Sequence, residues 1–267
     1  MAETTEVRLD VVSPDDIRFL QAESVGLALA RETGPVLADL IADFGTFEMA
    51  AVQSAVSFTM VDPVVVGYLA EYGAVTVHGI NQTTRAELAR TLAEGVLAGE
   101  GSGALALRVR DVFQRASAAR SAAIARTEVN GAANFSRTLA HQKSGTVKKR
   151  RWLSTRDLRT RSHHLKLHGQ VRGLKEPFVI PGTSRRALYP GGFGVASEDV
   201  NCRCTTLPIV NPVSDAIEDG LSAADKETVR AYELRVLRWE GAFTEALRRA
   251  FATQEAAVLA ALRRIRA

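Results

Sequence analysis

Two histidines and two cysteines carry the side chains with the clearest metal chemistry in the chain. His164 and His168 lie four residues apart, and Cys202 and Cys204 lie two apart. Imidazole nitrogen and thiolate sulfur are common zinc ligands, so these four residues could form a Cys2His2 site. However, Cys-x-Cys is a weaker signal than paired Cys-x-x-Cys, and the spacing matches no zinc finger or ribbon. We therefore expect no cofactor and keep zinc as the alternative.

The same residues allow two other interpretations. In one, His164 and Asn201 hydrogen bond with each other and the backbone, and the thiols pack as small buried groups. In the other, a cysteine acts as a nucleophile with His164 as its base. No motif supplies the oxyanion hole that such catalysis needs, and Walker, dinucleotide-binding, Gly-x-Ser-x-Gly and His-Glu-x-x-His motifs are missing from the sequence. We expect a non-enzyme without catalytic residues.

A charged motif precedes these histidines. Asp157, Arg159 and Arg161 share one face of an extended segment, while Asp157 and Arg161 lie one turn apart in a helix. Both geometries build an ion-pair network. Its arginines either recognise an anion such as phosphate or order the fold, and we favour the structural role.

A carboxylate lies on an apolar helix face upstream. At 100° per residue, Glu128 falls among Ile124, Ala132, Phe135 and Leu139, with polar residues on the opposite side. A buried carboxylate is costly unless it is paired. We therefore expect Glu128 to meet a cation from the following segment. The predicted structural cluster comprises Glu128, Asp157, Arg159, Arg161, His164, Asn201, Cys202 and Cys204.

A short basic run, Lys148, Lys149, Arg150 and Arg151, precedes Trp152. A cationic patch beside an aromatic ring is typical of phosphate-backbone contact, whereas a solvated connector explains the same run equally well. The net charge of +4 and the sequence pI of about 9.3 also favour an anionic partner mildly. A plain DNA-binding module is therefore a further hypothesis.

The elements that position these residues are mostly helices. Residues 1–80 read as a helical N-terminal region interrupted at Gly34 and Pro35, and residues 81–210 as a central module. That module has helices within 84–141, starting at a Thr84 capping box, a flexible Gly-rich elbow after Gly99, and a turn-rich part over 152–208. Residues 214–267 form an amphipathic C-terminal helix. The fold class is α+β.

The first residues lack the cationic, apolar start of a signal peptide, and no run of about 18 apolar residues occurs. We expect a protein that stays in a cytosol, or in a particle assembled there, with no membrane contact. Because the chain holds 2 cysteines at such close spacing, we expect reduced thiols.

The order of the motifs resembles one family. The features run from Ile124-Ala-Arg-Thr-Glu-Val-Asn130 through Trp152, Asp157-Leu-Arg-Thr-Arg161, His164, Gly169 and Phe178 to Pro190-Gly-Gly and Asn201-Cys-Arg-Cys204. Together they are similar to the phage Mu F-like minor head, or head morphogenesis, proteins of tailed phages and prophages. The resemblance covers about residues 84–208.

The resemblance implies a minor structural protein of the phage head, placed in the head interior of the virion. It also implies portal, capsid and scaffold proteins as partners, and a role in procapsid assembly and in packaging or ejection of double-stranded DNA. The alternative is a nucleic-acid-processing or toxin-like enzyme that uses His164, Cys202 and Cys204, with or without zinc.

Overall fold

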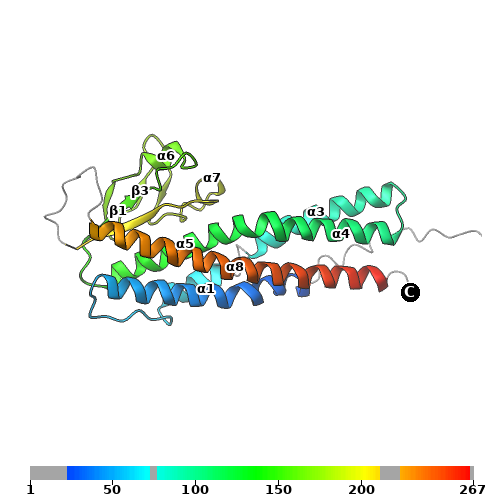
Figure 1. Ribbon diagram of the computed structural model, residues 1–267, viewed down its shortest axis with the longest axis horizontal. Helices are drawn as coiled ribbons and strands as arrows, with labels where there is room; N and C mark the ends of the chain where they lie inside the picture. The colour runs from blue at the N-terminus through cyan, green and yellow to red at the C-terminus, as the bar shows by residue number, and fades with distance from the viewer. Residues whose placement is uncertain (1–22, 73–76, 211–222, 265–267) are drawn as a thin grey trace, which may run out of the picture. The chain divides into compact units, whose positions relative to one another are not determined.

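The computed structural model describes residues 23–72, 77–210 and 223–264. Long helices flank a small segment of short strands (Figure 1), which confirms the predicted α+β class. The helices are α1 (Glu23–Ala51), α2 (Pro63–Glu71), α3 (Val77–Leu97), α4 (Ser102–Arg115), α5 (Ser121–Lys143), α6 (Ser162–Leu165), α7 (Ala196–Asp199) and α8 (Ala223–Arg264), with a π-helical turn η3 (Ala116–Arg120). The strands are β1 (Lys149–Leu153), β2 (Val171–Gly173), β3 (Phe178–Val179), β4 (Arg186–Ala187) and β5 (Thr205–Ile209). No described helix has the length and apolarity needed to cross a bilayer.

The chain packs into two compact units, each built from separate stretches of sequence. The first unit takes residues up to Gly34, residues 70–121 and residues 246–267. Here α3 packs against α4, and Gln254 of α8 donates a hydrogen bond to Asn81 of α3 at 2.8 Å. The buried side chains that form its interior include Leu29, Leu88, Leu92, Leu105, Val109, Phe113, Phe251 and Val258.

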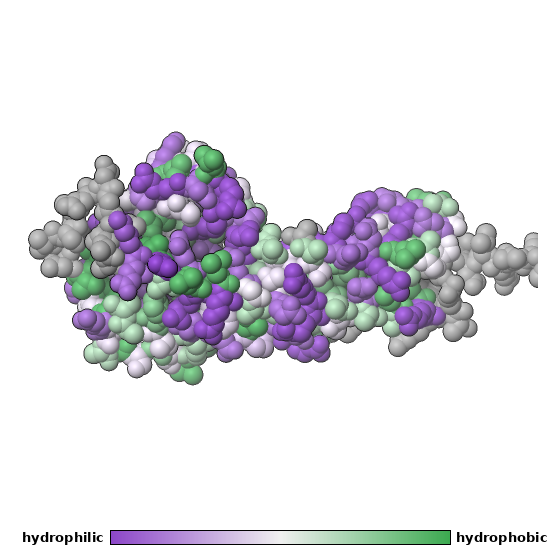
Figure 2. Space-filling view, viewed as in Figure 1, coloured by the Kyte–Doolittle hydropathy of each residue, from purple (hydrophilic) through white to green (hydrophobic). Residues whose placement is uncertain are grey.

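The second unit, residues 35–69 and 122–245, contains every predicted site residue. Its β-rich part, residues 149–209, is called the β-module below. Strand β1 is central in the antiparallel sheet β2-β1-β5, with Trp152 opposite Thr206, and β3 pairs with β4 in a second sheet. The side chains of β1 alternate in burial, so Arg150 and Trp152 face inward. Hydrophilic residues cover much of the visible face of this unit around the β-module (Figure 2).

Helix α5 is the central helix of this unit. Every residue from Val129 to His141 is buried, although a helix buried all round is normally apolar all round. Asn130, Asn134, Arg137 and His141 recur at spacings of four, three and four, so α5 carries a polar stripe through the interior. The stripe must find its hydrogen-bond partners inside the protein.

Two glycines let the loop after β4 approach α5. Gly191 has φ +86°, and a Cβ there would lie 2.9 Å from the Cα of Gly131. Side chains larger than hydrogen at Gly191 would therefore collide with the α5 backbone. This contact explains the Pro190-Gly-Gly motif and holds the loop that leads into α7.

Three sequence predictions about helix ends need correction or fall outside the described residues. Helix α1 continues through Gly34 and Pro35, because the fully buried Leu29 and Leu37 on either side bind it to the interior and outweigh the lost hydrogen bond. Helix α3 begins at Val77, so Thr84 lies inside it and bonds back to the Ile80 carbonyl at 3.2 Å. The sequence Ser13-Pro14-Asp15-Asp16 also predicts a helix start, and it lies outside the described residues.

Candidate functional site

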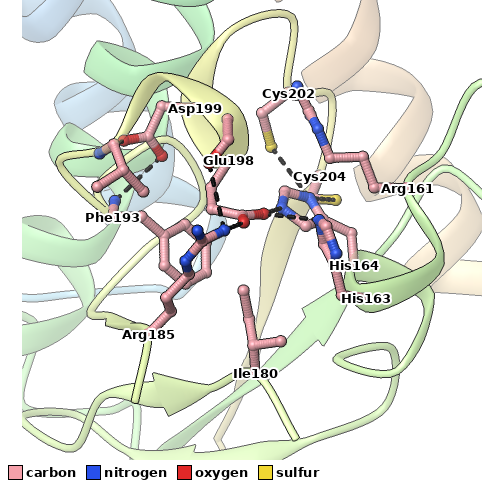
Figure 3. A network of polar contacts seen from close by, with 12 residues as sticks. Arg161, His163, His164, Ile180, Arg185, Phe193, Glu198, Asp199, Cys202 and Cys204 are labelled. Atoms are coloured by element: carbon pink, nitrogen blue, oxygen red, sulfur yellow. Dashed lines mark hydrogen bonds and ion pairs between the residues drawn. The ribbon is translucent and has the colours of Figure 1, made fainter. Parts of the chain in front are cut away.

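His164 is the centre of a buried cluster in the β-module. Its Nδ1 lies 3.8 Å from Cys202 Sγ and 3.5 Å from Cys204 Sγ (Figure 3). All three side chains are buried, with exposed fractions of 2% each. The structure thus brings together three of the four residues predicted as metal ligands.

The other ring nitrogen of His164 faces a carboxylate. Nε2 lies 3.0 Å from Glu198 Oε2, and His163 Nε2 lies 2.8 Å from the same oxygen. Arg185 pairs with the second oxygen, Oε1, as Figure 3 shows. Burial by itself raises the pKa of Glu198, but Arg185 and the two histidines outweigh it and hold the pKa below its ordinary value. Glu198 is therefore ionised at neutral pH and fixes the orientation of His164.

Local packing explains how short elements hold this cluster. Trp152 meets the His164 ring edge to face at 6.2 Å between ring centroids and the Phe178 ring at 5.1 Å. These rings pack with Leu167 and Ile180 around the two cysteines in one apolar cluster. Helix α6 has only four residues. Its position therefore depends on this packing and on a 2.6 Å hydrogen bond from Ser154 Oγ to the His164 carbonyl.

The pKa values of the Cys202 and Cys204 thiols depend on each other. A hydrogen bond from Cys202, opposed by burial and supported by His164, lowers the pKa of Cys204 to about 5. The same hydrogen bond and burial raise the pKa of Cys202 well above its ordinary value. The contact between the two thiols therefore favours ionisation of Cys204 over ionisation of Cys202.

A second polar cluster joins α1 to α5. Arg137 Nε donates to Glu48 Oε1 at 2.7 Å, and His141 Nε2 lies 3.1 Å from Glu48 Oε2. The side chains of all three are at most 1% exposed. Burial alone would raise the pKa of Glu48, but Arg137 and His141 outweigh it and lower the pKa to about 2. Burial lowers the pKa of His141, against the pull of Glu48, so its imidazole is neutral at pH 7.

Strand β5 connects the two clusters. Arg137 Nη1 donates to Thr205 Oγ1 at 2.7 Å and to the Thr206 carbonyl at 2.8 Å. Asn134 accepts from the Thr205 hydroxyl at 2.9 Å and donates to the Cys204 carbonyl at 3.1 Å. A continuous buried network therefore runs from α1 through α5 and β5 to α6. The members of this network make hydrogen bonds that connect these elements. This explains why so many polar residues lie in the interior of the unit.

The predicted Asp157 motif forms a different ion pair from the expected one. Asp157 accepts two 2.7 Å hydrogen bonds from Arg203, which hold its pKa far below the ordinary value. Arg159 lies 3.7 Å from the same carboxylate and is 78% exposed. Arg161 instead donates to the Val200 carbonyl at 2.6 Å, which ties the start of α6 to the segment after α7.

Asn201 and His168 lie beside the thiol cluster and make other contacts. Asn201 adopts a left-handed backbone with φ 56°, which asparagine tolerates better than most residues. It accepts from Arg126 and its backbone N–H donates to Thr127, so it ties this turn to α5 and not to His164. His168 Nδ1 accepts a 3.1 Å hydrogen bond from the Ser154 backbone N–H.

Glu128 does not meet a cation. Within the described residues, the charged neighbour that acts on it is the carboxylate of Asp199. Burial and that like charge raise the pKa of Glu128 to about 7. The buried carboxylates with a cationic partner are Glu48, paired with Arg137, and Glu198, paired with Arg185. Both lie outside the helix face that the periodicity indicates.

The raised pKa of Glu128 allows us to predict how Glu128→Gln changes stability with pH. Because the folded pKa of about 7 exceeds the ordinary value of 4.5, this carboxyl favours folding below pH 4.5, and the benefit disappears as pH rises through 7. Glutamine carries no charge at either pH. At pH 8 we expect the variant to be more stable than the wild type by about 1–3 kcal/mol, and at pH 4 to be equal. Urea unfolding at both values measures this, and equal stability at pH 8 would contradict it.

The basic run is only partly on the surface. Arg150 is fully buried, so it cannot reach a DNA phosphate, and its predicted role in nucleic-acid contact is wrong. Its guanidinium donates to the carbonyls of Leu188 and Leu174 at 2.5 and 2.9 Å. Lys148 is exposed, and Lys149 and Arg151 are half-buried on the outer face of β1. The nucleic-acid prediction remains for these three residues.

Several members of the network carry no sequence signal of their own. Glu198 lies in the four-residue helix α7, and Arg185 and Arg203 lie outside helices and strands, so none of them has a periodic signal. Glu48 lies 89 positions from Arg137. The polar spacing from Asn130 to His141 is the one signal that could have indicated a buried stripe.

Comparison with known proteins identifies the central segment of the chain. Residues 86–207 match the family described as phage Mu protein F like protein. This segment is a phage Mu F-like domain. It spans the second half of α3, all of α4 and α5, and nearly all of the β-module, so the buried network from Arg137 to Cys204 lies inside the Mu F-like domain. The resemblance seen in the motifs is confirmed.

Three curated proteins share this kind of segment. Minor head protein GP7 of Bacillus phage SPP1 is 34% identical over 128 residues, which are 46% of this chain and 40% of GP7. The uncharacterized protein YqbB of Bacillus subtilis is 34% identical over 115 residues, 42% of this chain and 36% of YqbB. The NAD(+)–arginine ADP-ribosyltransferase EFV of Enterococcus faecalis is 33% identical over 155 residues, 56% of this chain and 31% of EFV.

The chain thus spans about a third of the length of these relatives. No solved structure matches the chain.

Proposed function

We propose that this chain is a minor structural protein of a tailed-phage or prophage-derived head. It joins the head with the portal protein during procapsid assembly, contacts capsid or scaffold proteins, and acts in DNA packaging or ejection from the head interior. The observation that carries the proposal is the Mu F-like domain over residues 86–207, together with the 34% identity to minor head protein GP7. The domain match covers the part of the chain that contains the motif residues.

The burial of the motif supports a structural role over an enzymatic one. His164, Cys202 and Cys204 are 2% exposed, so a substrate would reach a thiolate only after the β-module opened. Catalytic cysteines are normally partly exposed in electropositive surroundings. Arg137, Arg150 and Asn134 donate hydrogen bonds to backbone carbonyls, and such bonds stabilise the fold.

The transferase relative does not change this proposal. Three relatives with different names share segments of 115 to 155 residues with this chain, and 31% of EFV is covered. We infer that the shared part is the head-type domain, and that transferase chemistry belongs to the rest of EFV. The exposed Lys148 and Arg159 favour contact with packaged DNA, because cations near the surface bind phosphate without sequence readout.

Co-expression with the portal protein of the same genome tests the proposal. An affinity-tagged portal protein is expected to retain this chain through washes at moderate salt, and a portal protein from an unrelated phage serves as the control. Retention by the cognate portal alone supports a specific contact. If both proteins are folded and neither portal retains the chain, the portal association is wrong.

A further inference from the structure

We propose that His164, Cys202 and Cys204 bind one Zn2+ ion through His164 Nδ1 and the two thiolate sulfurs. The proposal concerns the interior of the β-module and is independent of the role in the phage head. It follows from ligand geometry, from the partners of His164, and from the burial of the site.

The three ligand atoms already lie at the separations of a tetrahedral zinc site. With Zn–S of about 2.3 Å and Zn–N of about 2.0–2.1 Å, a tetrahedral angle places nitrogen and sulfur roughly 3.5 Å apart. Nδ1 of His164 lies 3.5 Å from Cys204 Sγ and 3.8 Å from Cys202 Sγ. All three atoms lie within 4.8 Å of one another. An ion can therefore be bound with little movement of the side chains.

Glu198 supplies the outer contact that zinc-bound histidines usually have. Metal-ligating histidine normally donates its second ring N–H to a carboxylate, which fixes the tautomer and the ring plane. His164 Nε2 lies 3.0 Å from Glu198 Oε2, and Arg185 holds the other carboxylate oxygen. Because the two ring nitrogens point in different directions, Glu198 and His163 lie outside the coordination of an ion at Nδ1 (Figure 3).

His168 does not supply the fourth ligand in this proposal. A small molecule from outside the protein takes that position. Its Nδ1 accepts the Ser154 backbone N–H, which leaves the proton of a neutral imidazole on Nε2 and no free lone pair for a metal. Among the described residues, the buried set contains three protein ligands. Water then takes the fourth position, as in other zinc sites with three protein ligands.

Charge and ligand type favour zinc. Two thiolates with neutral imidazole carry a charge of −2, and a divalent cation balances it in an interior where unpaired charge is costly. Sulfur and imidazole ligands in a tetrahedral arrangement favour Zn2+ over magnesium or calcium, which prefer oxygen. The ion would tie together α6, the segment after α7 and the residue before β5, which lack long elements of their own.

Metal analysis of the full-length chain, purified without a histidine tag, tests the proposal. We expect about one zinc per chain after growth with added Zn2+. Replacement by Co2+ should give the absorption of thiolate-to-cobalt charge transfer. Chelation should lower the melting temperature. A folded wild-type chain that takes up no zinc, or a cobalt complex without thiolate absorption, would overturn the site.

Variants separate the proposed ligands from their neighbours. Cys202→Ser and Cys204→Ser should each abolish the thiolate absorption expected of the wild type, while His168→Gln should retain one metal per chain. Glu198→Gln should keep the stoichiometry and weaken zinc affinity about 10–100-fold. Circular dichroism checks that each variant folds. Loss of metal in folded His168→Gln with retention in both cysteine variants would contradict the assignment.

Discussion

Arg137→Met is expected to lower the free energy of unfolding by about 3–5 kcal/mol. The guanidinium donates to Glu48, Thr205 and the Thr206 carbonyl in an interior with no exposure. Methionine fills similar volume but leaves the Glu48 carboxylate with a neutral histidine as its side-chain partner. The folded state loses stability because a buried charge remains without its counter-ion. The loss does not come from the attraction between two solvated groups. Urea unfolding at pH 7 measures the change.

The same helix provides the control. Lys143 pairs with Asp62 at 2.9 Å but is 51% exposed, so Lys143→Met should cost less than about 1 kcal/mol. The double variant Glu48→Leu with Arg137→Met removes both charges and should lose less stability than the two single changes added together. If Arg137→Met costs no more than Lys143→Met, the buried network does not stabilise the domain.

Arg150→Met is the second large effect, with an expected loss of about 3 kcal/mol in the free energy of unfolding. The buried guanidinium donates to the carbonyls of Leu188, Leu174, Gly173 and Glu176, and burial lowers its pKa to about 10, so it stays charged at pH 7. Removing it takes away the donor for the part-buried carbonyls of Leu188 and Glu176 and one of the donors for those of Leu174 and Gly173. Arg150→Lys should recover only part of the loss, because an ammonium cannot reproduce the planar array of donors.

Lys148→Met is the matched control two positions away. Lys148 is exposed and donates to the Gly145 carbonyl at 3.1 Å, so its replacement should leave stability almost unchanged. An Arg150→Met chain that unfolds at the same urea concentration as Lys148→Met would show that the hydrogen bonds of Arg150 do not stabilise the fold.

The sequence predicts the elements whose signals are local. The elbow at Gly99 to Gly103 separates α3 from α4 as expected, the turn-rich segment after Trp152 contains the four short strands β2 to β5, and the amphipathic stripe from Tyr232 to Leu262 lies in α8. Each of these depends on neighbours within a few residues. The division into residues 1–80, 81–210 and 214–267 stays a prediction, because both compact units combine segments that are far apart in sequence.

The candidate site could be predicted only in part. Cys202, Cys204 and His164 lie together, as predicted from their residue types, because all three can bind a metal ion. Glu48 could not be identified as the partner of Arg137 because a pairing across 89 positions leaves no local pattern. Helical periodicity places Glu128 on the apolar face of α5, but periodicity does not identify the charge that faces a side chain, which here is Asp199 from a distant segment.

The content of purified heads is the most direct test of the proposed head role. Heads from cells carrying the complete phage genome can be separated from free protein by sedimentation and their proteins counted by mass spectrometry. We predict that this chain co-sediments with the portal protein in heads, and that deletion of its gene removes it and lowers the yield of DNA-filled particles. Heads of normal composition and DNA content that form while this chain stays in the free fraction would contradict the proposal.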